Sequence, residues 1–342
     1  MGQTDRARRT FLAGISALGA GALVPGCASG PAAGDSIERN KAVALRFKKL
    51  QGTKDEPLIA KEVLAPDYKR TRGGMLNLAN NARDQGFPSS GSYLRAAFPD
   101  RVDVIEQVIS EDDQVGLLFR LTGTHTGNLF GIPPTGRKVD VYEAAILRIA
   151  NGRVSEGWFM ADEAGLLKQL GVGLPRRKDG KLIAPPMTGT GETGDAWLAR
   201  LKARPADTEA ARNKVIVASS KSSSPPKGYR AEDYKQLRQG FQHLRNHGIA
   251  TGTAKETPTR ALPDRRDFVD GFIAEGDTVW MKFRISGTQT RPLYGHPATN
   301  LRVEVPEIGI ARFRDGKWQS GWYFGDELAM MIQLGALQML KS

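Results

Sequence analysis

The sequence is poor in cysteine and in long hydrophobic runs. Its only cysteine among 342 residues is Cys27. A single thiol excludes an internal disulfide framework, so the fold must be held together by its cores. The apolar stretch Leu12–Val24 has only 13 residues, whereas a membrane-spanning helix needs about 20. The chain therefore has the composition of a folded protein without disulfides, and this stretch is too short to be a spanning helix.

Aromatic residues make up only 7% of the chain, and they are not interleaved with the basic residues. The formal net charge is +12, but the basic residues are scattered in short groups such as Arg176-Arg177-Lys178. A nucleic-acid surface would combine clustered basic residues with aromatic ones, so the pattern argues against a nucleic-acid partner. Attraction to anionic lipid head groups and a plain solvated surface both remain open.

The N-terminus has the features of an export signal. Arg8-Arg9-Thr10-Phe11-Leu12 resembles a twin-arginine signal, and Leu23–Cys27 resembles a lipobox in which Cys27 is lipidated. We therefore expect a signal over residues 1–27, a small polar tether over 28–36, and a periplasmic lipoprotein attached to the membrane by its lipid anchor. The alternatives are a permanent anchor helix and an incidental Cys27 close to a peptidase site.

The second half of the chain repeats the first half. A shift of 164 residues aligns Pro99–Gly171 with Pro263–Gly335 without a gap, and 30 of the 73 positions are identical. This period exceeds the 20–50 residues of a solenoid unit and is close to the size of a whole domain. The repeat predicts a first domain over 37–172, a linker rich in Gly, Pro and basic residues over 173–206, and a second domain over 207–342.

Each copy is expected to begin with helices and to continue with strands. In copy one, helical spacing predicts helices over Ile37–Leu50, Pro57–Val63 and Ser89–Phe98, with a chain crossing at Leu64–Tyr68. Alternation and turn residues then predict four strands, at Val102–Glu111, Gln114–His125, Lys138–Ala150 and Arg153–Ala161. Asn151-Gly152 is a hairpin signal, and a closing helix over Glu163–Leu170 would end at Gly171. Helices followed by antiparallel strands indicate the α+β class.

The motifs GTHTG and GIPPTGR, followed by a terminal QLG, resemble the SnoaL-like polyketide cyclases and ester cyclases. This resemblance implies two tandem cone-shaped domains of the nuclear transport factor 2 type, each with a curved antiparallel sheet packed against its N-terminal helices. It also implies an apolar pocket that binds a small carbonyl compound, and acid–base ring closure without a metal or an organic cofactor. The fold commonly associates through its sheet, which implies an intramolecular pseudo-dimer of the two copies.

Asp162 corresponds to the acidic residue that follows the last-strand tryptophan of the family. Alternation places Trp158, Met160 and Asp162 on one face of the strand, and a carboxylate beside Trp and Met would have a raised pKa, as a base requires. The resemblance therefore implies that Asp162 is the acid/base. Because Asp162 also directly precedes a helix, N-capping alone is the alternative.

Other residues support the same predicted pocket. Glu143 lies on an otherwise apolar strand face and must be paired, protonated or in a cavity; an ion pair with Arg120 or Arg148 is the structural alternative. His125 is a third candidate for chemistry, although Gln289 replaces it in copy two. The expected pocket wall consists of Trp158, Tyr68, Phe119 and Met160. The copy-two equivalents of the site residues are Asp326, Glu307 and Trp322.

Two departures from the family weaken the catalytic prediction. Family members commonly carry a histidine directly before the last-strand tryptophan, where this chain has Gly157 and Gly321. They also frequently carry a histidine soon after the segment that ends at Tyr68, where this chain has Lys69-Arg70-Thr71-Arg72. Two hypotheses follow from the sequence. The first is cyclisation or enolisation of a small apolar carbonyl compound in domain 1, and the alternative is a non-catalytic periplasmic binding or scaffold lipoprotein.

Overall fold

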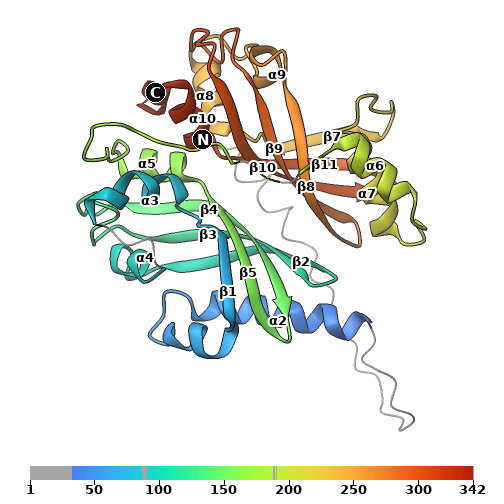
Figure 1. The fold of residues 1–342 in the computed structure, drawn as a ribbon, viewed down its shortest axis with the longest axis horizontal. Helices are drawn as coiled ribbons and strands as arrows, with labels where there is room; N and C mark the ends of the chain where they lie inside the picture. The colour runs from blue at the N-terminus through green and yellow to red at the C-terminus, as the bar shows by residue number, and fades with distance from the viewer. Residues whose placement is uncertain (1–32, 87–90, 188, 190, 342) are drawn as a thin grey trace.

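The computed structural model describes residues 33–341 except 87–90, 188 and 190 (Figure 1). The predicted signal over 1–27, with Arg8, Arg9 and Cys27, and residues 28–32 of the predicted tether lie outside the described residues. No helix in the described part of the chain is both long enough and apolar enough to cross a membrane.

Copy one follows the predicted order of helices and then strands, except that one strand and one helix that were not predicted, at Leu64–Arg72 and Leu76–Ala82, lie among the first helices. Its elements are α2 (Ala33–Leu50), the π-helical turn η1 (Ile59–Val63), β1 (Leu64–Arg72), α3 (Leu76–Ala82), η2 (Arg83–Gln85), α4 (Gly91–Ala97), β2 (Val102–Glu111), β3 (Gln114–Thr124), β4 (Lys138–Ala150), β5 (Arg153–Ala161) and α5 (Glu163–Leu170). The hairpin between β4 and β5 turns at Asn151 and Gly152, both with positive φ, and Gly171 ends α5 in the left-handed conformation. These local predictions are confirmed.

Copy two repeats this order. Its elements are α7 (Glu209–Ser219), β7 (Arg230–Arg238), α8 (Gln242–Ala250), α9 (Pro258–Ala261), β8 (Arg266–Glu275), β9 (Thr278–Thr288), β10 (Arg302–Arg314), β11 (Lys317–Gly325), α10 (Glu327–Leu334) and η3 (Leu337–Lys341). The strand orders are β1-β5-β4-β3-β2 in the first sheet and β6-β8-β9-β10-β11-β7 in the second, where β6 is the short strand Glu192–Thr193. The two copies therefore share one topology.

Both sheets are mixed, which corrects the expectation of purely antiparallel sheets. β1 runs parallel to β5, and β7 runs parallel to β11. Residues 64–68, expected to be a chain crossing, form the first part of β1, and Pro66 within them cannot donate a backbone hydrogen bond. The structure places Pro66 on an edge strand, where a missing donor is tolerated. Bulges after Ile105 in β2 and after Val269 in β8 bend the two sheets.

The segment expected to be a linker over 173–206 is partly regular. The short strand β6 (Glu192–Thr193) pairs with β8, and α6 (Gly194–Lys202) follows it. The hydroxyl of Thr193 accepts a hydrogen bond from Ala196 N and caps α6, and Trp197 donates to the carbonyl of Val269 at 2.8 Å. These contacts attach the second part of the segment to the copy-two sheet.

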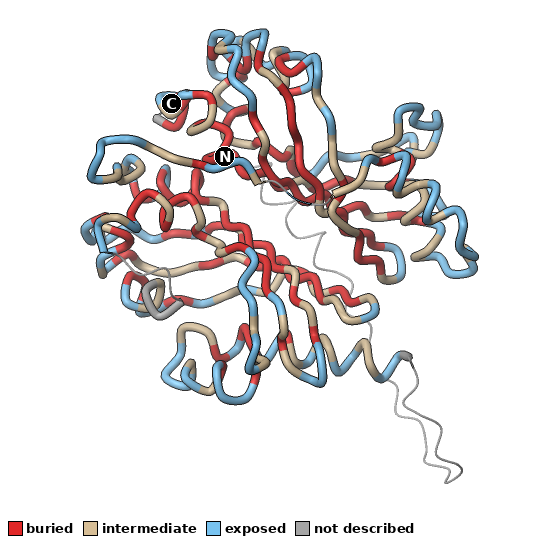
Figure 2. Tube along the Cα trace, viewed as in Figure 1, coloured by how far each residue is buried: buried red, intermediate tan, exposed pale blue. Residues whose placement is uncertain are grey.

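The two sheets face each other across an apolar layer. Figure 2 shows buried segments concentrated on the strands where the two sheets meet. One buried cluster combines residues of both copies: Ile109, Leu118, Ala144, Trp158, Met160, Ile273, Trp280, Ile308, Ile310, Trp322 and Phe324. The same cluster has Tyr142 packed edge-on against Trp322, with ring centroids 5.3 Å apart. The burial of apolar surface is the dominant favourable contribution to a contact of this kind.

Polar contacts between the copies are reciprocal. Lys41 of copy one pairs with Glu275 of copy two, and Lys214 of copy two pairs with Glu111 of copy one. Each glutamate also accepts a backbone N–H of the other copy at 2.9 Å, from Ser110 or from Ala274. Such pairs of equivalent contacts are typical of an interface with two-fold symmetry.

Candidate functional site

Each copy places four charged residues between its first long helix and its sheet. Asp103 binds Lys48 at 2.7 Å and accepts from Arg101 Nε at 2.9 Å, with Glu143 close by. The corresponding set in copy two is Lys221, Arg265, Asp267 and Glu307, in which Arg265 Nε lies 2.8 Å from Asp267 and Lys221 pairs with the same aspartate. The same four residue types therefore recur at equivalent positions in the interior of both copies.

An aromatic ring supports the lysine in each set. The ammonium group of Lys48 lies 3.5 Å from the centroid of the Phe119 ring, and that of Lys221 lies 3.7 Å from the Phe283 ring. Burial lowers the pKa of both lysines, although the neighbouring aspartates oppose this shift. A cation held over a ring and against a carboxylate is fixed in position within the domain.

The copy-two set opens into a cavity of about 360 Å³. Glu307 lines this cavity, and its carboxyl group is buried. Burial raises the pKa of Glu307 to about 7, against the opposing charges of Lys221 and Arg265. The other polar lining residues include Arg230, Tyr234, Gln236, Gln239, Tyr294 and Tyr323. The volume lies in the range of small-molecule sites, and the lining is mainly polar.

Glu143 occupies the equivalent position in copy one. It is buried, and burial raises its pKa while Lys48 and Arg101 oppose the shift. The predicted partners are wrong, because Arg120 binds Glu106 and Asp140, and Arg148 binds Asp113. Those two arginines lie on alternate strand positions that face away from the interior, and the true neighbours come from distant segments.

Two glycines explain why the family's histidine is absent before the last-strand tryptophan. A β-carbon at Gly157 would lie 2.4 Å from the Tyr68 hydroxyl, and one at Gly321 would lie 2.4 Å from the Tyr234 hydroxyl. The tyrosine of the edge strand therefore fills the space that a side chain at the glycine position would need. Tyr68 and Phe119 face the interior of copy one, where Phe119 belongs to the buried apolar cluster and Tyr68 packs against it. Their role in a substrate pocket stays a prediction.

Trp158 and Met160 face the other copy. Both belong to the apolar layer between the sheets, together with Trp322. Alternation correctly placed Trp158 and Met160 on one face, but that face is opposite to the interior that contains Glu143. The prediction that they form the wall of the domain 1 pocket is wrong, because the neighbouring inward position of β5 is Phe159.

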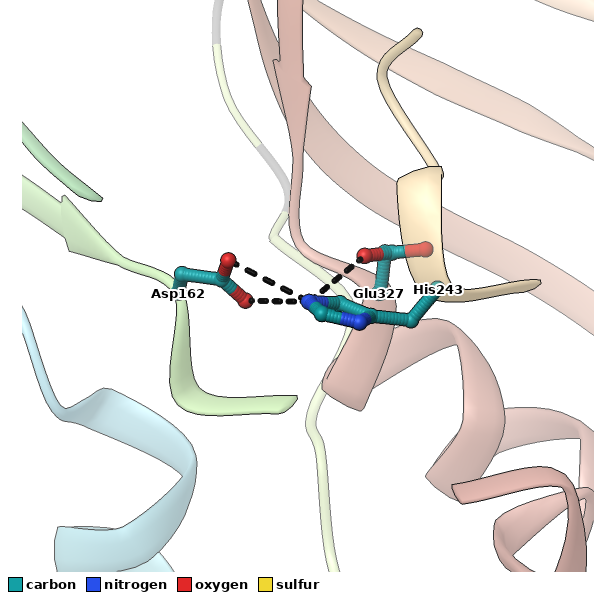
Figure 3. A group of neighbouring side chains, drawn as sticks. All are labelled: Asp162, His243 and Glu327. Atoms are coloured by element: carbon teal, nitrogen blue, oxygen red, sulfur yellow. Dashed lines mark hydrogen bonds and ion pairs between the residues drawn. The ribbon is translucent and has the colours of Figure 1, made fainter. Parts of the chain in front are cut away.

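Asp162 is an N-cap within an ion-pair network between the copies. Its carboxylate accepts a hydrogen bond from Gly165 N at 2.8 Å and contacts Arg238 at 3.0 Å. It also lies 3.2 Å from His243 Nε2 (Figure 3). Burial raises the pKa of Asp162, but Arg238 and His243 more than offset this and hold it well below its usual range. The expected raised pKa is therefore wrong, and Asp162 is a stabilised carboxylate.

Asp326 makes the reciprocal set of contacts. It caps α10 through Ala329 N, pairs with Arg72 of copy one, and accepts from Asn77 Nδ2 at 2.9 Å. Asn77 Nδ2 also donates to Glu163 at 2.7 Å. Burial and the charge of Asp326 raise the pKa of Glu163 to about 8. Each cap is thus held by an arginine and a second polar residue from the opposite copy.

His125 organises the loop between β3 and β4. It is fully buried, its Nδ1 lies 3.1 Å from the Thr135 hydroxyl, and its ring packs against Phe98. Burial lowers its pKa. Gln289 binds the matching loop of copy two through Thr299, Arg291 O and Pro297 O. The shared structural position accounts for the exchange of His for Gln.

Several residues of these networks were missed in the sequence, among them two recurring basic pairs. Arg72 and Arg238 recur at a spacing of 166 residues, and Lys48 and Lys221 recur at 173, whereas the sheet repeats at 164. A gapless comparison at one spacing therefore cannot align them. Allowing short insertions between the helical and strand parts of the repeat would have found both pairs.

The model of the SnoaL-like polyketide cyclase family matches residues 54–170 and again 227–334. The chain is a member of this family. The two matches contain one complete sheet each apart from the short strand β6, in agreement with the tandem repeat. Membership confirms the resemblance, and it supports a cyclase-type function.

Two curated relatives are ester cyclases. The SnoaL-like chain is 28% identical over 103 residues to aklanonic acid methyl ester cyclase DauD of Streptomyces sp. (strain C5), which covers 30% of this chain and 64% of that protein. It is also 29% identical over 111 residues to nogalonic acid methyl ester cyclase of Streptomyces nogalater. That match covers 32% of this chain and 81% of the relative. The match thus includes less than two thirds of the length of the first relative.

A solved structure from Jannaschia sp. CCS1, of a SnoaL-like protein, aligns with 39% of this chain and 92% of its own length. The sequence identity is 22% and the TM-score is 0.33.

Proposed function

We propose that the interior of copy two catalyses acid–base ring closure, or a related enolisation, of a small carbonyl compound of the polyketide type. The observation that carries this proposal is Glu307, a buried carboxyl group that lines a cavity of about 360 Å³ and has a pKa of about 7. A general base is most effective when its pKa lies near the working pH. Family membership and the ester cyclase relatives support the reaction class.

The reaction needs one group that both accepts and returns a proton. Ionised Glu307 removes a proton from a carbon that lies between two carbonyl groups, and the resulting enolate carbon attacks a second carbonyl of the same molecule. The alkoxide that forms takes the proton back from Glu307. No proton or electron is gained or lost overall, so one carboxyl group is sufficient for the proton transfers.

Lys221 and Arg265 supply positive charge beside the reacting enolate. Both line the cavity, and Asp267 fixes both in position. Fixed cations near a developing negative charge stabilise it without a cost of reorganisation during the reaction. Arg230 lies at the same cavity, 4.6 Å from the ring centroid of Tyr234, and offers a further cationic group to the substrate.

We propose Glu307, and not Asp162 as predicted from the sequence, as the catalytic acid/base. Asp162 is bound to Arg238 and His243 in the contact between the copies, and it lies outside the lining of the copy-two cavity. We propose that the two copies act as an intramolecular pseudo-dimer, in which this contact positions the two units. The reciprocal ion pairs and the shared apolar layer support that role.

The test compares matched carboxyl residues in the two copies. Glu307→Gln should lower kcat for the methyl ester of nogalonic or aklanonic acid by about 10²–10⁴-fold, the usual contribution of acid–base catalysis, while the protein stays folded. Glu143→Gln should have a smaller effect on kcat. A larger loss in Glu143→Gln would place the reaction in copy one. Equal turnover by both variants and the wild type would contradict the role of Glu307, and no turnover by the wild type would favour the non-catalytic binding function.

We also propose that the protein is exported by the twin-arginine route and is anchored through lipidated Cys27 in the periplasm. The motif Arg8-Arg9 and the segment Leu23–Cys27 support this proposal. Replacing both arginines by lysine should leave the precursor in the cytoplasm, and Cys27→Ala should release a soluble form. Unchanged export or continued membrane attachment would contradict the corresponding step.

A further inference from the structure

Three potential metal ligands meet at the contact between the copies. Asp162 comes from the start of α5 in copy one, His243 from α8, and Glu327 from α10 in copy two (Figure 3). His243 Nε2 lies 3.2 Å from Asp162 Oδ1 and 3.9 Å from Glu327 Oε2, and the three ligand atoms lie within 4.8 Å of one another. Tetrahedral Zn²⁺ with bonds of about 2.0–2.1 Å separates its ligand atoms by about 3.3 Å, so small movements would bring these atoms into register.

The site has more acceptors than donors. His243 Nε2 carries at most one proton, and it faces oxygen atoms of both Asp162 and Glu327. Glu327 Oε1 accepts from Leu244 N at 2.9 Å. Glu327 Oε2 is buried and has no hydrogen-bond donor among the described residues, while the residue as a whole is 3% exposed. A buried carboxylate oxygen without a donor is costly, and a cation between Glu327 Oε2 and His243 Nε2 would stabilise it.

The matching site on the other side of the interface is complete without any added group. Asn77 takes the place of His243, and its amide donates to Asp326 at 2.9 Å and to Glu163 at 2.7 Å. The main-chain N–H groups of Asn77 and Leu78 also donate to Glu163. An amide group has two protons and can serve two carboxylates, whereas one imidazole nitrogen cannot. The unsatisfied oxygen is therefore specific to the His243 side.

We propose that Asp162, His243 and Glu327 bind a divalent first-row metal ion, of which Zn²⁺ is the best match, and that this ion bridges the two copies. One imidazole and two carboxylates suit Zn²⁺, and a water molecule would complete a tetrahedral set. Arg238 remains bound to the other oxygen of Asp162 and orients this ligand. Because the ligands come from both copies, the bound ion stabilises the interface and is separate from the Glu307 cavity.

The first experiment measures metal stoichiometry and thermal stability of the full chain after treatment with a chelator. We expect one equivalent of Zn²⁺ per chain, a higher Tm with Zn²⁺ present, and visible Co²⁺ absorption typical of low coordination number. His243→Asn places at this position the residue type of Asn77, its counterpart in copy one. This variant should stay folded but lose the bound Zn²⁺, the rise in Tm with Zn²⁺ and the Co²⁺ absorption. Absence of tight Zn²⁺ binding to the wild type, or its persistence in His243→Asn, would overturn the proposal. Glu327→Gln serves as a second variant and should weaken binding at least tenfold.

The second experiment transfers the site to the other side of the interface. Asn77→His brings an imidazole to Asp326 and Glu163, which are the counterparts of Asp162 and Glu327. We expect this variant to bind two equivalents of Zn²⁺ per chain. A stoichiometry that remains at one would contradict the geometric argument, since the same three ligand types at equivalent positions would then not suffice.

Discussion

Asn77 and His243 occupy matching positions in the two copies, but only Asn77 donates hydrogen bonds to both of the carboxylates that face it. Around these residues the interface is nearly symmetric, with Arg72 bound to Asp326 on one side and Arg238 bound to Asp162 on the other. The difference between an amide and an imidazole is therefore a local chemical change within an otherwise repeated contact.

The reciprocal ion pairs should be important for stability. Arg72→Ala leaves Asp326 buried without its cation, and breaking a buried pair in this way costs about 3–5 kcal/mol. Urea unfolding would measure this loss. Arg148→Ala removes an exposed pair with Asp113 and should cost less than about 1 kcal/mol. Similar losses for both variants would show that the interface pair contributes little.

Substitutions at Asp162 should separate the helix cap from the ion pair. Asp162→Asn keeps a good N-cap for α5 but removes the charge opposite Arg238, so a clear loss of stability is expected. Asp162→Ala removes the cap as well, at a further cost of about 0.5–2 kcal/mol. The measurement is the free energy of unfolding of both variants. Wild-type stability of Asp162→Asn would show that capping alone explains this residue.

The raised pKa of Glu307 predicts opposite effects of pH on activity and stability. The base must be ionised, so kcat/KM should rise with pH through about 7. The folded-state pKa lies above the unfolded value of about 4.3, so stability from this group is greatest below that value and falls as pH rises through about 7. The groups that face Glu307 are Lys221, Arg265, Asp267, Tyr294 and Tyr323.

Glu307→Gln provides the control for that pH dependence. The variant cannot ionise at this position, so the part of the stability loss that arises between about pH 4.3 and 7 should disappear, up to about 3 kcal/mol. Thermal melting of both proteins across this pH range measures the difference. Identical pH profiles for the wild type and the variant would show that Glu307 does not titrate in this range.

The glycine before each last-strand tryptophan should be hard to replace. Gly321→Ala places a methyl group 2.4 Å from the Tyr234 hydroxyl and should destabilise the protein by about 1–3 kcal/mol, as overpacking does. Adding Tyr234→Phe removes the hydroxyl and should recover part of that loss. Unfolding experiments on the single and double variants test this coupling, and strictly additive effects would contradict it.

Local patterns predicted most of the fold. Alternation and the Asn151-Gly152 turn fixed the four long strands of copy one, and Asp162 and Gly171 marked the two ends of α5. β1 was missed because Pro66 and the lack of alternation conceal an edge strand that is mostly exposed. The repeat then carried the correct strand predictions from one copy to the other.

The candidate site was harder to predict because its environment is non-local. Alternation placed Trp158 and Asp162 together but could not show which side of the strand faces the domain interior. The pKa of Asp162 depends on Arg238 and His243, which lie 76 and 81 residues away in the sequence. Glu307 was identified as a recurring buried carboxyl, but the cavity beside it depends on the packing of several elements.

The covalent connection between the copies has a consequence for how this interface can change. In a dimer of identical chains, every substitution appears on both sides of the two-fold axis at once. Here the two halves are encoded separately, so an asparagine can remain at position 77 while a histidine stands at position 243. Each half of the contact can therefore change independently of the other, and the linked halves always assemble with each other.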